Sequence, residues 1–140
     1  MSTDAPAPPE PQGDYVPATV HNGVVYTAGM TPRVDGRMTV TGVVGDSLTT
    51  TQAREAAGVA ARNALAAARA ALPSGALRCL KMTVFVACSP DFHDLSQVAD
   101  GASAVIGAEL GARLPARSAI GVQSLPSGAP VEVELVCAEG

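Results

Sequence analysis

After the first 14 residues, many hydrophobic positions fall in short runs of β-branched and aromatic residues, which are typical of β-strands. β-prone residues at 19–21 and 24–27 flank an Asn-Gly pair at 22–23, a strong hairpin signal because both residues tolerate positive φ. A second turn signal at 35–36 precedes a short β-prone run at 37–40. The pattern therefore predicts a hairpin followed by a third, short strand.

A helical period follows these strand-forming runs. Thr49 and Gln52 have the spacing of a capping box, in which each side chain bonds the other residue's backbone N–H. Polar residues recur seven or eight positions apart after this point, which leaves one helix face to be buried. That face contains Ala57, Ala60, Ala61, Ala64, Leu65, Ala68 and Leu72, and Pro73 ends the predicted helix.

The second half of the chain contains three strand patterns and one more helix. The almost uninterrupted apolar run at 77–87 predicts a central strand buried on both faces. Residues 89–110 are expected to form a helix, with serine as its N-cap and proline in its first turn. Strands at 117–123 and 131–136 complete the order β-β-β-α-β-α-β-β. This order predicts an α+β fold with two helices on one face of a mixed sheet.

Composition adds a boundary and an expectation of self-association. Residues 1–14 are rich in proline and lack apolar periodicity, so they are expected to form a flexible tail before a single domain at 15–138. Hydrophobic residues make up 47% of the 140, but 26 residues are alanine and only four are aromatic. Such a thin core predicts that contacts between subunits supply part of the stability.

Charge and cysteine content exclude several classes of function. The net charge of −4 and the single lysine argue against binding to nucleic acid. No apolar run approaches the roughly 18–20 residues of a membrane span, and no signal peptide pattern opens the chain. Three cysteines without CxxC spacing and two histidines make a metal site unexpected, and Cys79 and Cys137 are predicted as core residues. We therefore expect a cytoplasmic protein that binds neither membranes nor metals.

The C-terminal strands contain the candidate chemistry. Arg117, Ala119 and Gly121 share one face, which places a guanidinium beside residues with almost no side chain and predicts a small-anion site. Glu132 and Glu134 share a face of the last strand. Alternation alone routinely produces such patterns, so the pattern by itself favours the other interpretation, a solvated outer face with a surface Arg–Glu pair.

Several of these segments together resemble the Rid family of reactive intermediate deaminases, also called the YjgF family. The C-terminal signature is the most specific part of this resemblance, which covers residues 15–136. The matching segments are Pro115-Ala116-Arg117-Ser118, Gly121-Val122, Leu125-Pro126 and Val131-Glu132-Val133-Glu134, supported by Tyr15, Thr27-Ala28-Gly29-Met30, Gln52-Ala53-Arg54 and Thr83-Val84-Phe85-Val86.

The resemblance implies a chorismate-mutase-like fold assembled as a homotrimer, with pockets between subunits and no cofactor. Members of the family hydrolyse enamines and imines such as 2-aminoacrylate and 2-iminopropionate to a 2-keto acid and ammonia. Carried over, Arg117 would bind the substrate carboxylate, and Glu132 would position or deprotonate the attacking water. Tyr15 and Gly29 would line the pocket, and Asp100 stands where the family often has asparagine.

Four pocket positions depart from the family pattern. Ala28 replaces a serine, Met30 a glutamine, Ala119 a cysteine and Gly121 a glutamate. A roomier and more apolar pocket would admit an imine larger than iminopropionate. Three other functions stay open: a non-catalytic trimer that binds a small metabolite, an enzyme acting on an imine in one biosynthetic pathway, and the ribonuclease activity reported within the family. The scarcity of lysine argues against the last of these.

Overall fold

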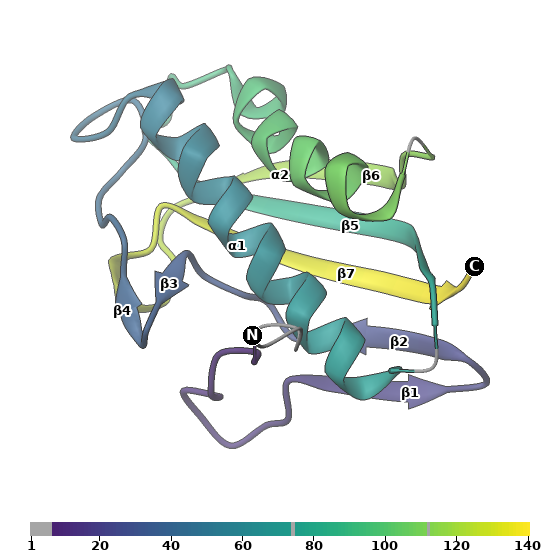
Figure 1. Cartoon of the computed structure of the whole chain (residues 1–140). Coiled ribbons are helices and arrows are strands. Elements are labelled where there is room, and N and C mark those ends of the chain that lie inside the picture. The colour runs from purple at the N-terminus through teal and green to yellow at the C-terminus, as the bar shows by residue number, and fades with distance from the viewer. Residues whose placement is uncertain (1–6, 74, 112) are drawn as a thin grey trace, which may run out of the picture.

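A computed structural model describes residues 7–73, 75–111 and 113–140 of the chain. Five strands form a mixed sheet in the order β1-β2-β7-β5-β6, and both helices cover one of its faces (Figure 1). Only β5 and β6 are parallel neighbours. The elements are β1 (Ala18–His21), β2 (Val24–Thr27), β3 (Arg33–Val34), β4 (Arg37–Met38), α1 (Thr50–Ala71), β5 (Leu77–Ala87), α2 (Leu95–Leu110), β6 (Ala116–Val122), the 3-10 turn η1 (Pro126–Gly128) and β7 (Val131–Glu139).

The N-terminal hairpin is confirmed, and its turn has the geometry that an Asn-Gly pair favours. Asn22 and Gly23 have φ of 51° and 75°, and β1 pairs antiparallel with β2 on either side of them. The predicted third strand is shorter than expected, because β4 ends at Met38 and pairs only with β3, in a small sheet of its own. Residues 7–12 lie beside this second hairpin, and residues 1–6 of the predicted tail lie outside the described part of the chain.

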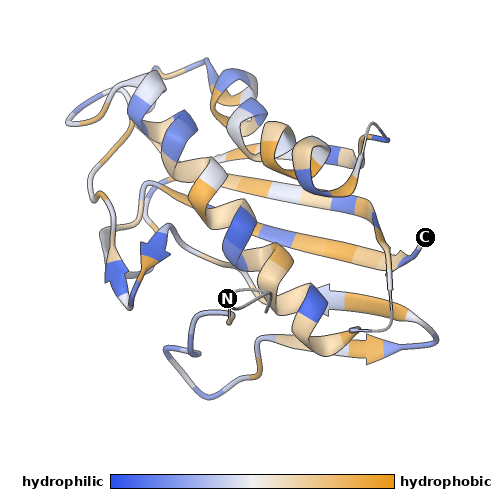
Figure 2. Cartoon of the chain, in the orientation of Figure 1, coloured by the Kyte–Doolittle hydropathy of each residue, from blue (hydrophilic) through white to orange (hydrophobic). Residues whose placement is uncertain are grey.

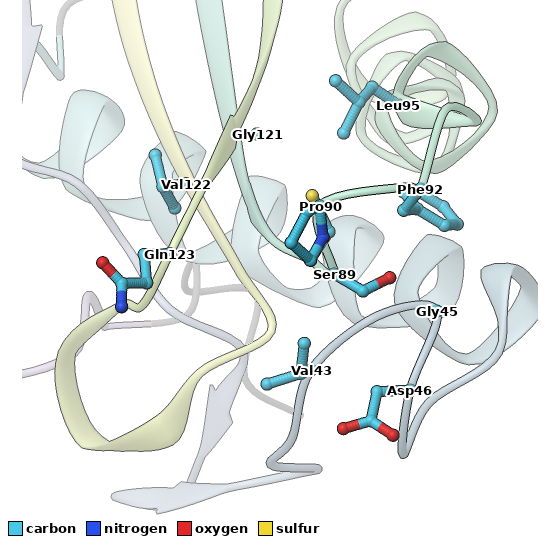
Figure 3. Close-up of a pocket in the computed structure, with 11 residues that line it drawn as sticks. Val43, Gly45, Asp46, Ser89, Pro90, Phe92, Leu95, Gly121, Val122 and Gln123 are labelled. Carbon is cyan, nitrogen blue, oxygen red and sulfur yellow. The ribbon is translucent and has the colours of Figure 1, made fainter.

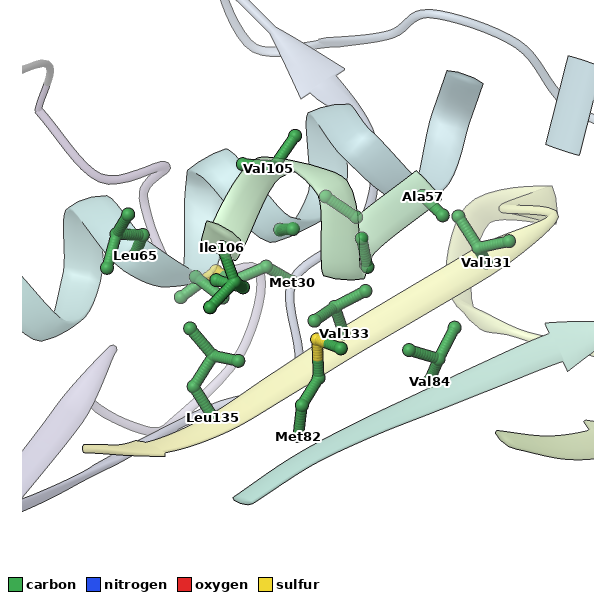
Figure 4. Close-up of a cluster of buried hydrophobic side chains, with 14 of the residues drawn as sticks. Met30, Ala57, Leu65, Met82, Val84, Val105, Ile106, Val131, Val133 and Leu135 are labelled. Atoms are coloured by element: carbon green, nitrogen blue, oxygen red, sulfur yellow. The ribbon is translucent and has the colours of Figure 1, made fainter. Parts of the chain in front are cut away.

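Helix α1 begins at the predicted capping box. The Thr49 hydroxyl accepts a hydrogen bond from the Gln52 N–H at 3.1 Å, and the Gln52 side chain accepts one from the Thr49 N–H at 2.9 Å. The predicted alanine face is buried except at its end, where Leu72 is half-buried. Small side chains let α1 lie close to the sheet, where Leu65 joins the aliphatic side chains of β5, β7 and α2 (Figures 2 and 4).

The predicted start of the second helix is wrong. Ser89 does not cap a helix; its N–H donates to the Val44 carbonyl at 3.0 Å, and the Phe92 N–H donates back to the Ser89 carbonyl at 3.1 Å. These bonds make a turn that is held against the loop before α1. Helix α2 therefore begins only at Leu95, with Asp94 as its N-cap residue.

Strand β5 has the predicted bounds, but its burial differs from the prediction. Met82, Val84 and Val86 face the helices and are fully buried, whereas alternate residues such as Phe85 are only half-buried on the other face. Cys79 and Cys137 are buried, as predicted. The strand is central in the sheet, but the helices cover only one of its faces, so its second face is incompletely covered in a single chain.

The two helices approach each other closely where a glycine allows it. A Cβ atom on Gly101 would collide with the carbonyl oxygen of Arg54 in α1, so the contact requires glycine. An ion pair between Arg69 and Glu109, at 3.0 Å, joins the far ends of the same two helices. Among the described residues, no helix is long and apolar enough to cross a bilayer.

Candidate active site

Arg117 lies on the edge strand β6 and points toward the helices. One of its terminal nitrogens, Nη1, donates to Asp100 Oδ1 at 2.7 Å and to Ser103 Oγ at 2.9 Å. The other, Nη2, donates to Ser96 Oγ at 2.8 Å. These bonds use three of the five N–H donors of a guanidinium. The cation is therefore held in one orientation, with 22% of its side chain exposed.

The three partners of Arg117 form one polar stripe along α2. Ser96, Asp100 and Ser103 are spaced by four and three residues, which places them on the same face of a helix. Asp100 was predicted from the sequence, whereas Ser96 and Ser103 were not. The spacing of the two serines is the signal that could have identified them, and it becomes informative because β6 packs beside α2.

Glu132 lies on the opposite face of the sheet, opposite Phe85 in the neighbouring strand. Its carboxyl group sits over Gly29, where a Cβ atom would come within 2.5 Å of Glu132 Cδ and Oε2. Burial raises the pKa of Glu132 above its ordinary value, and the nearby charge of Glu134 raises it further. Within the described residues it makes no hydrogen bond or ion pair, so it is a half-buried carboxyl available to a ligand or to water.

The structure does not bring Arg117 and Glu132 together within one chain. Strand alternation turns Arg117 toward α2, whereas the neighbours of Glu132 in β7, Val131 and Val133, are the residues that face the helices. The interpretation of these residues as a surface Arg–Glu pair is therefore wrong. Arg117 pairs with Asp100 instead.

The remaining predicted residues divide between core and surface. Met30 is 6% exposed and belongs to the hydrophobic core, so its side chain does not face the same surface as Glu132. Ala28 and Ala119 are partly buried against that core, and Ala119 faces α2 with Arg117. Tyr15 is 50% exposed, and its hydroxyl accepts a hydrogen bond from the Gln12 N–H at 3.2 Å.

The space predicted beside Arg117 opens farther along the same face of β6, at Gly121. Here a cleft of about 890 Å³ lies between the end of β6, the loop before α1 and the segment that leads into α2 (Figure 3). It is lined by Val43, Gly45, Asp46, Cys88, Ser89, Pro90, Phe92, Leu95, Gly121, Val122 and Gln123. No cluster of three or more metal-ligating side chains occurs in the described ranges.

The fold is that of a small α+β protein with two helices on one face of a mixed sheet, and comparisons with known proteins identify the family to which it belongs. A model of the family described as endoribonuclease L-PSP matches residues 5–139. The chain is 38% identical over 135 residues to Protein TCP17 of Trypanosoma cruzi, with 92% of this chain and 83% of that protein covered.

Two solved structures support the same assignment. One, a protein of unknown function from Agrobacterium tumefaciens, is 36% identical with a TM-score of 0.87, covering 93% of this chain and 85% of that one. The other, the YjgF gene product of E. coli, is 26% identical with a TM-score of 0.68, covering 95% and 94%. The chain belongs to the YjgF or Rid family, also described as the endoribonuclease L-PSP family.

Proposed function

We propose that this protein hydrolyses reactive enamines and imines, of the 2-aminoacrylate and 2-iminopropionate type or larger, to a keto acid or another carbonyl product and ammonia. The observation that carries the proposal is Glu132. A half-buried carboxylate with a raised pKa and no partner among the described residues suits a general base, because its basicity is closer to that required at neutral pH. Membership of the Rid family supports the same reaction.

In the proposed reaction, Glu132 takes a proton from water as the water oxygen attacks the imine carbon. The new C–O bond forms while the electron pair of the C=N bond moves to nitrogen, which takes a proton from solvent. Glu132 then gives its proton to the nitrogen of this carbinolamine. The C–N bond breaks and ammonia leaves as the hydroxyl group loses its proton to solvent and the C=O bond forms. An enamine substrate first gains a proton at carbon and loses one from nitrogen, and so becomes the imine. The residues needed are one base and one group that binds the substrate, so no cofactor enters the scheme.

Arg117 is the proposed carboxylate-binding group. A guanidinium offers a planar pair of donors that matches a carboxylate, and its hydrogen bonds to α2 hold it in place before a ligand arrives. Two of its five donors have no hydrogen-bond acceptor among the described residues. These donors are the ones proposed to contact the substrate.

The separation of Arg117 from Glu132 leads us to propose that each site combines two copies of the chain in a homotrimer. Strand β6 is a sheet edge, so Arg117 lies where a neighbouring copy can approach. The open face that carries Glu132 also exposes Tyr26 and Ile120, at 47% and 42%, and half-exposes Phe85. An apolar face of this kind is typical of a surface covered by association. Tyr15, Ala28 and Gly29 would line the Glu132 side, with Asp100 and Ala119 on the Arg117 side.

A non-catalytic trimer that binds a small metabolite is the second candidate function. It is favoured by the pairing of Arg117 with Asp100, since an anion site already neutralised by an internal carboxylate would release its ligand readily. A biosynthetic enzyme acting on one imine is a special case of the first proposal, with the same two residues in the same roles.

Release of ammonia and keto acid tests the proposal directly. Imines would be generated in situ by an amino-acid oxidase, and both products followed with and without the protein. We expect acceleration over spontaneous hydrolysis that Glu132→Gln abolishes. Wild-type protein that is trimeric and binds keto acids, but accelerates no imine, would support the binding protein instead. A monomer near 14.0 kDa by sedimentation equilibrium would contradict the shared site.

A further inference from the structure

Two buried thiols lie directly opposite each other in the sheet. Cys79 in β5 pairs with Cys137 in the antiparallel strand β7, and both side chains belong to the core beneath the helices. Both thiols are free in this structure. They lie on the opposite face of the sheet from Glu132, and neither has a part in the proposed hydrolysis. The pair is therefore a second group of reactive side chains outside the candidate active site.

The register of the two strands places the sulfur atoms in position to bond. Directly opposite residues of antiparallel strands have Cα atoms about 4.5 or 5.5 Å apart, and disulfides span Cα separations of about 4.4–6.8 Å. The Cys137 thiol donates a hydrogen bond to the Cys79 sulfur, so the two side chains already point toward each other. Formation of a disulfide therefore needs rotation of the side chains and no shift of either strand.

The two thiols are not equivalent as nucleophiles. The hydrogen bond from Cys137 lowers the pKa of Cys79 below its ordinary value. The same bond raises the pKa of Cys137, and burial raises it further. Because the thiolate is the reactive form of cysteine, Cys79 is the one that attacks first and Cys137 the one that resolves the product.

Cys79 is also the more accessible thiol. It is 5% exposed, whereas Cys137 is fully buried. A β-bulge follows it, because β5 has one residue more than β7 between the pairs Cys79–Cys137 and Lys81–Val136. A bulge disrupts the hydrogen bonds of a sheet locally, and the additional residue, Leu80, is exposed. A small oxidant thus has a short path to Cys79. The pair faces the helices, so association through the open face does not cover it.

We propose that Cys79 and Cys137 form a reversible disulfide when the protein is exposed to a peroxide. The Cys79 thiolate attacks one oxygen of hydrogen peroxide. The S–O bond forms, the O–O bond breaks, and the leaving hydroxide takes up the proton that Cys79 released and becomes water. The Cys137 sulfur then attacks the sulfur of this sulfenic acid, the S–S bond forms, and a second water leaves with the Cys137 proton. The two thiols lose two electrons, which the peroxide gains.

The disulfide would join two strands that are far apart in sequence. It closes a loop that contains α2 and β6, and it ties together the pair of strands at the centre of the sheet. A cross-link over a long loop restricts the unfolded chain and stabilises the folded one. Oxidation should therefore raise the Tm by about 5–15 °C, and a dithiol reductant should reverse the change. This inference does not depend on the proposed hydrolysis.

Counting thiols in the intact protein provides the test. Reduced protein would be treated with hydrogen peroxide while folded, then unfolded in an alkylating reagent and weighed by mass spectrometry. The number of alkylated thiols should fall from three to one, with the loss of two hydrogen atoms and no added oxygen. Peptide mapping should join the peptides of Cys79 and Cys137, and reduction should restore all three thiols.

Substitutions by alanine separate the roles of the cysteines, because a buried free cysteine packs as a small hydrophobic residue. Cys137→Ala should leave Cys79 as a sulfenic acid that dimedone captures, whereas Cys79→Ala should leave Cys137 unreacted. Cys88→Ala is the matched control. Cys88 is half-buried, burial raises its pKa, and its loss should leave the cross-link unchanged. If an alanine variant does not fold, the mapping of the wild-type protein still decides.

Three results would overturn the proposal. The first is three free thiols after peroxide treatment of the folded wild-type protein. The second is oxidation confined to Cys88, or conversion of Cys79 to sulfinic acid without a cross-link. The third is a disulfide between Cys79 and Cys137 that lowers the Tm, which would show that the fold does not accommodate the bond. Equal dimedone capture in Cys79→Ala and Cys137→Ala would overturn the assignment of Cys79 as the attacking thiol.

Discussion

The two faces of the sheet differ in how they hold the two charged residues of the proposed site, Arg117 and Glu132. On the helix-covered face, Arg117 is bound by three side chains of α2 at 2.7–2.9 Å. On the open face, Glu132 lies against Gly29 with no partner among the described residues and a raised pKa. A cation held by hydrogen bonds suits binding, because its position is set before the ligand arrives. A poorly solvated carboxylate suits proton transfer, because its charged form is the less stabilised one.

Neither charged residue forms the proposed site alone within one chain. Arg117 has donors for an anion, but the carboxylate beside it, Asp100, is already paired with it, whereas Glu132 makes no ion pair with a cation among the described residues. In the proposed trimer, the helix-covered face of one copy supplies the first and the open face of the next supplies the second.

Loss of the open-face charge should have the largest effect. Glu132→Gln preserves shape and removes the base, so kcat should fall about 10²–10⁴-fold while binding of a keto acid changes little. Steady-state kinetics and calorimetry on the same samples separate these quantities. An equal loss of kcat and of binding would assign Glu132 to binding instead.

The pH dependence of activity and stability should identify the same carboxyl. Because the pKa of Glu132 is raised above about 4.5, kcat/KM should rise with pH through an apparent pKa above that value, and the variant should lack this limb. A raised pKa in the folded state contributes stability below the ordinary pKa that is lost as pH rises through the folded pKa. Glu132→Gln should therefore have a Tm equal to or higher than that of the wild type at pH 7, measured by thermal unfolding.

Removal of the cation on the other face should reduce binding. Arg117→Ala loses a charge-assisted contact of about 2–4 kcal/mol, so kcat/KM should fall about 30–1,000-fold. Arg117→Lys should recover little, because an ammonium lacks the planar pair of donors. If Arg117→Ala folds, stays trimeric and retains the full rate on every carboxylate imine tested, Arg117 has no role in the site.

The contact between α1 and α2, the helix that holds Arg117, can be changed at a residue that does not bond to Arg117. Gly101→Ala forces a methyl group against the Arg54 carbonyl and should destabilise the protein by about 1–3 kcal/mol or more. Gly107→Ala, in open space on the same helix, should stabilise it by up to about 1 kcal/mol. Denaturant unfolding measures both, and similar effects of the two changes would contradict the close contact between α1 and α2.

The smallest expected effect concerns the internal partner of Arg117. Asp100→Asn removes the carboxylate that pairs with the guanidinium, so a keto acid should bind more tightly. The pair is partly exposed, with half of the Asp100 side chain accessible, so its contribution is at most about 1 kcal/mol and the gain at most about fivefold. Calorimetry at low salt should show the largest gain. Weaker binding would make Asp100 a support for Arg117 rather than a competitor.

Much of the fold could be predicted because local signals and tertiary structure agree. The Asn22-Gly23 turn, the Thr49 capping box and the bounds of β5 depend on nearby residues and are confirmed. The start of α2 depends on a distant contact, the bond from the Ser89 N–H to the Val44 carbonyl, and no local pattern shows it. Burial of β5 on one face only likewise depends on where the two helices pack against the sheet, and no local pattern shows this.

The candidate site was less predictable than the fold. Alternation correctly groups Arg117 with Ala119 and Gly121, because that relation is local to one strand. It does not show which side faces the helices, so it left open a pairing with Glu132 that the structure contradicts. Met30 shows the same limit, because its burial results from the bridge to Val133 in β7 and not from its own neighbours in sequence.

Mixing two inactive variants tests the shared site most directly. Arg117→Ala and Glu132→Gln proteins would be dissociated, combined in equal amounts and reassembled, then assayed for imine hydrolysis. If each site takes its arginine from one copy and its glutamate from another, about a quarter of the sites regain both residues, and activity should return to about a quarter of wild type. Activity that stays at the level of the separate variants, in a preparation shown by mass spectrometry to contain mixed trimers, would contradict a site shared between copies.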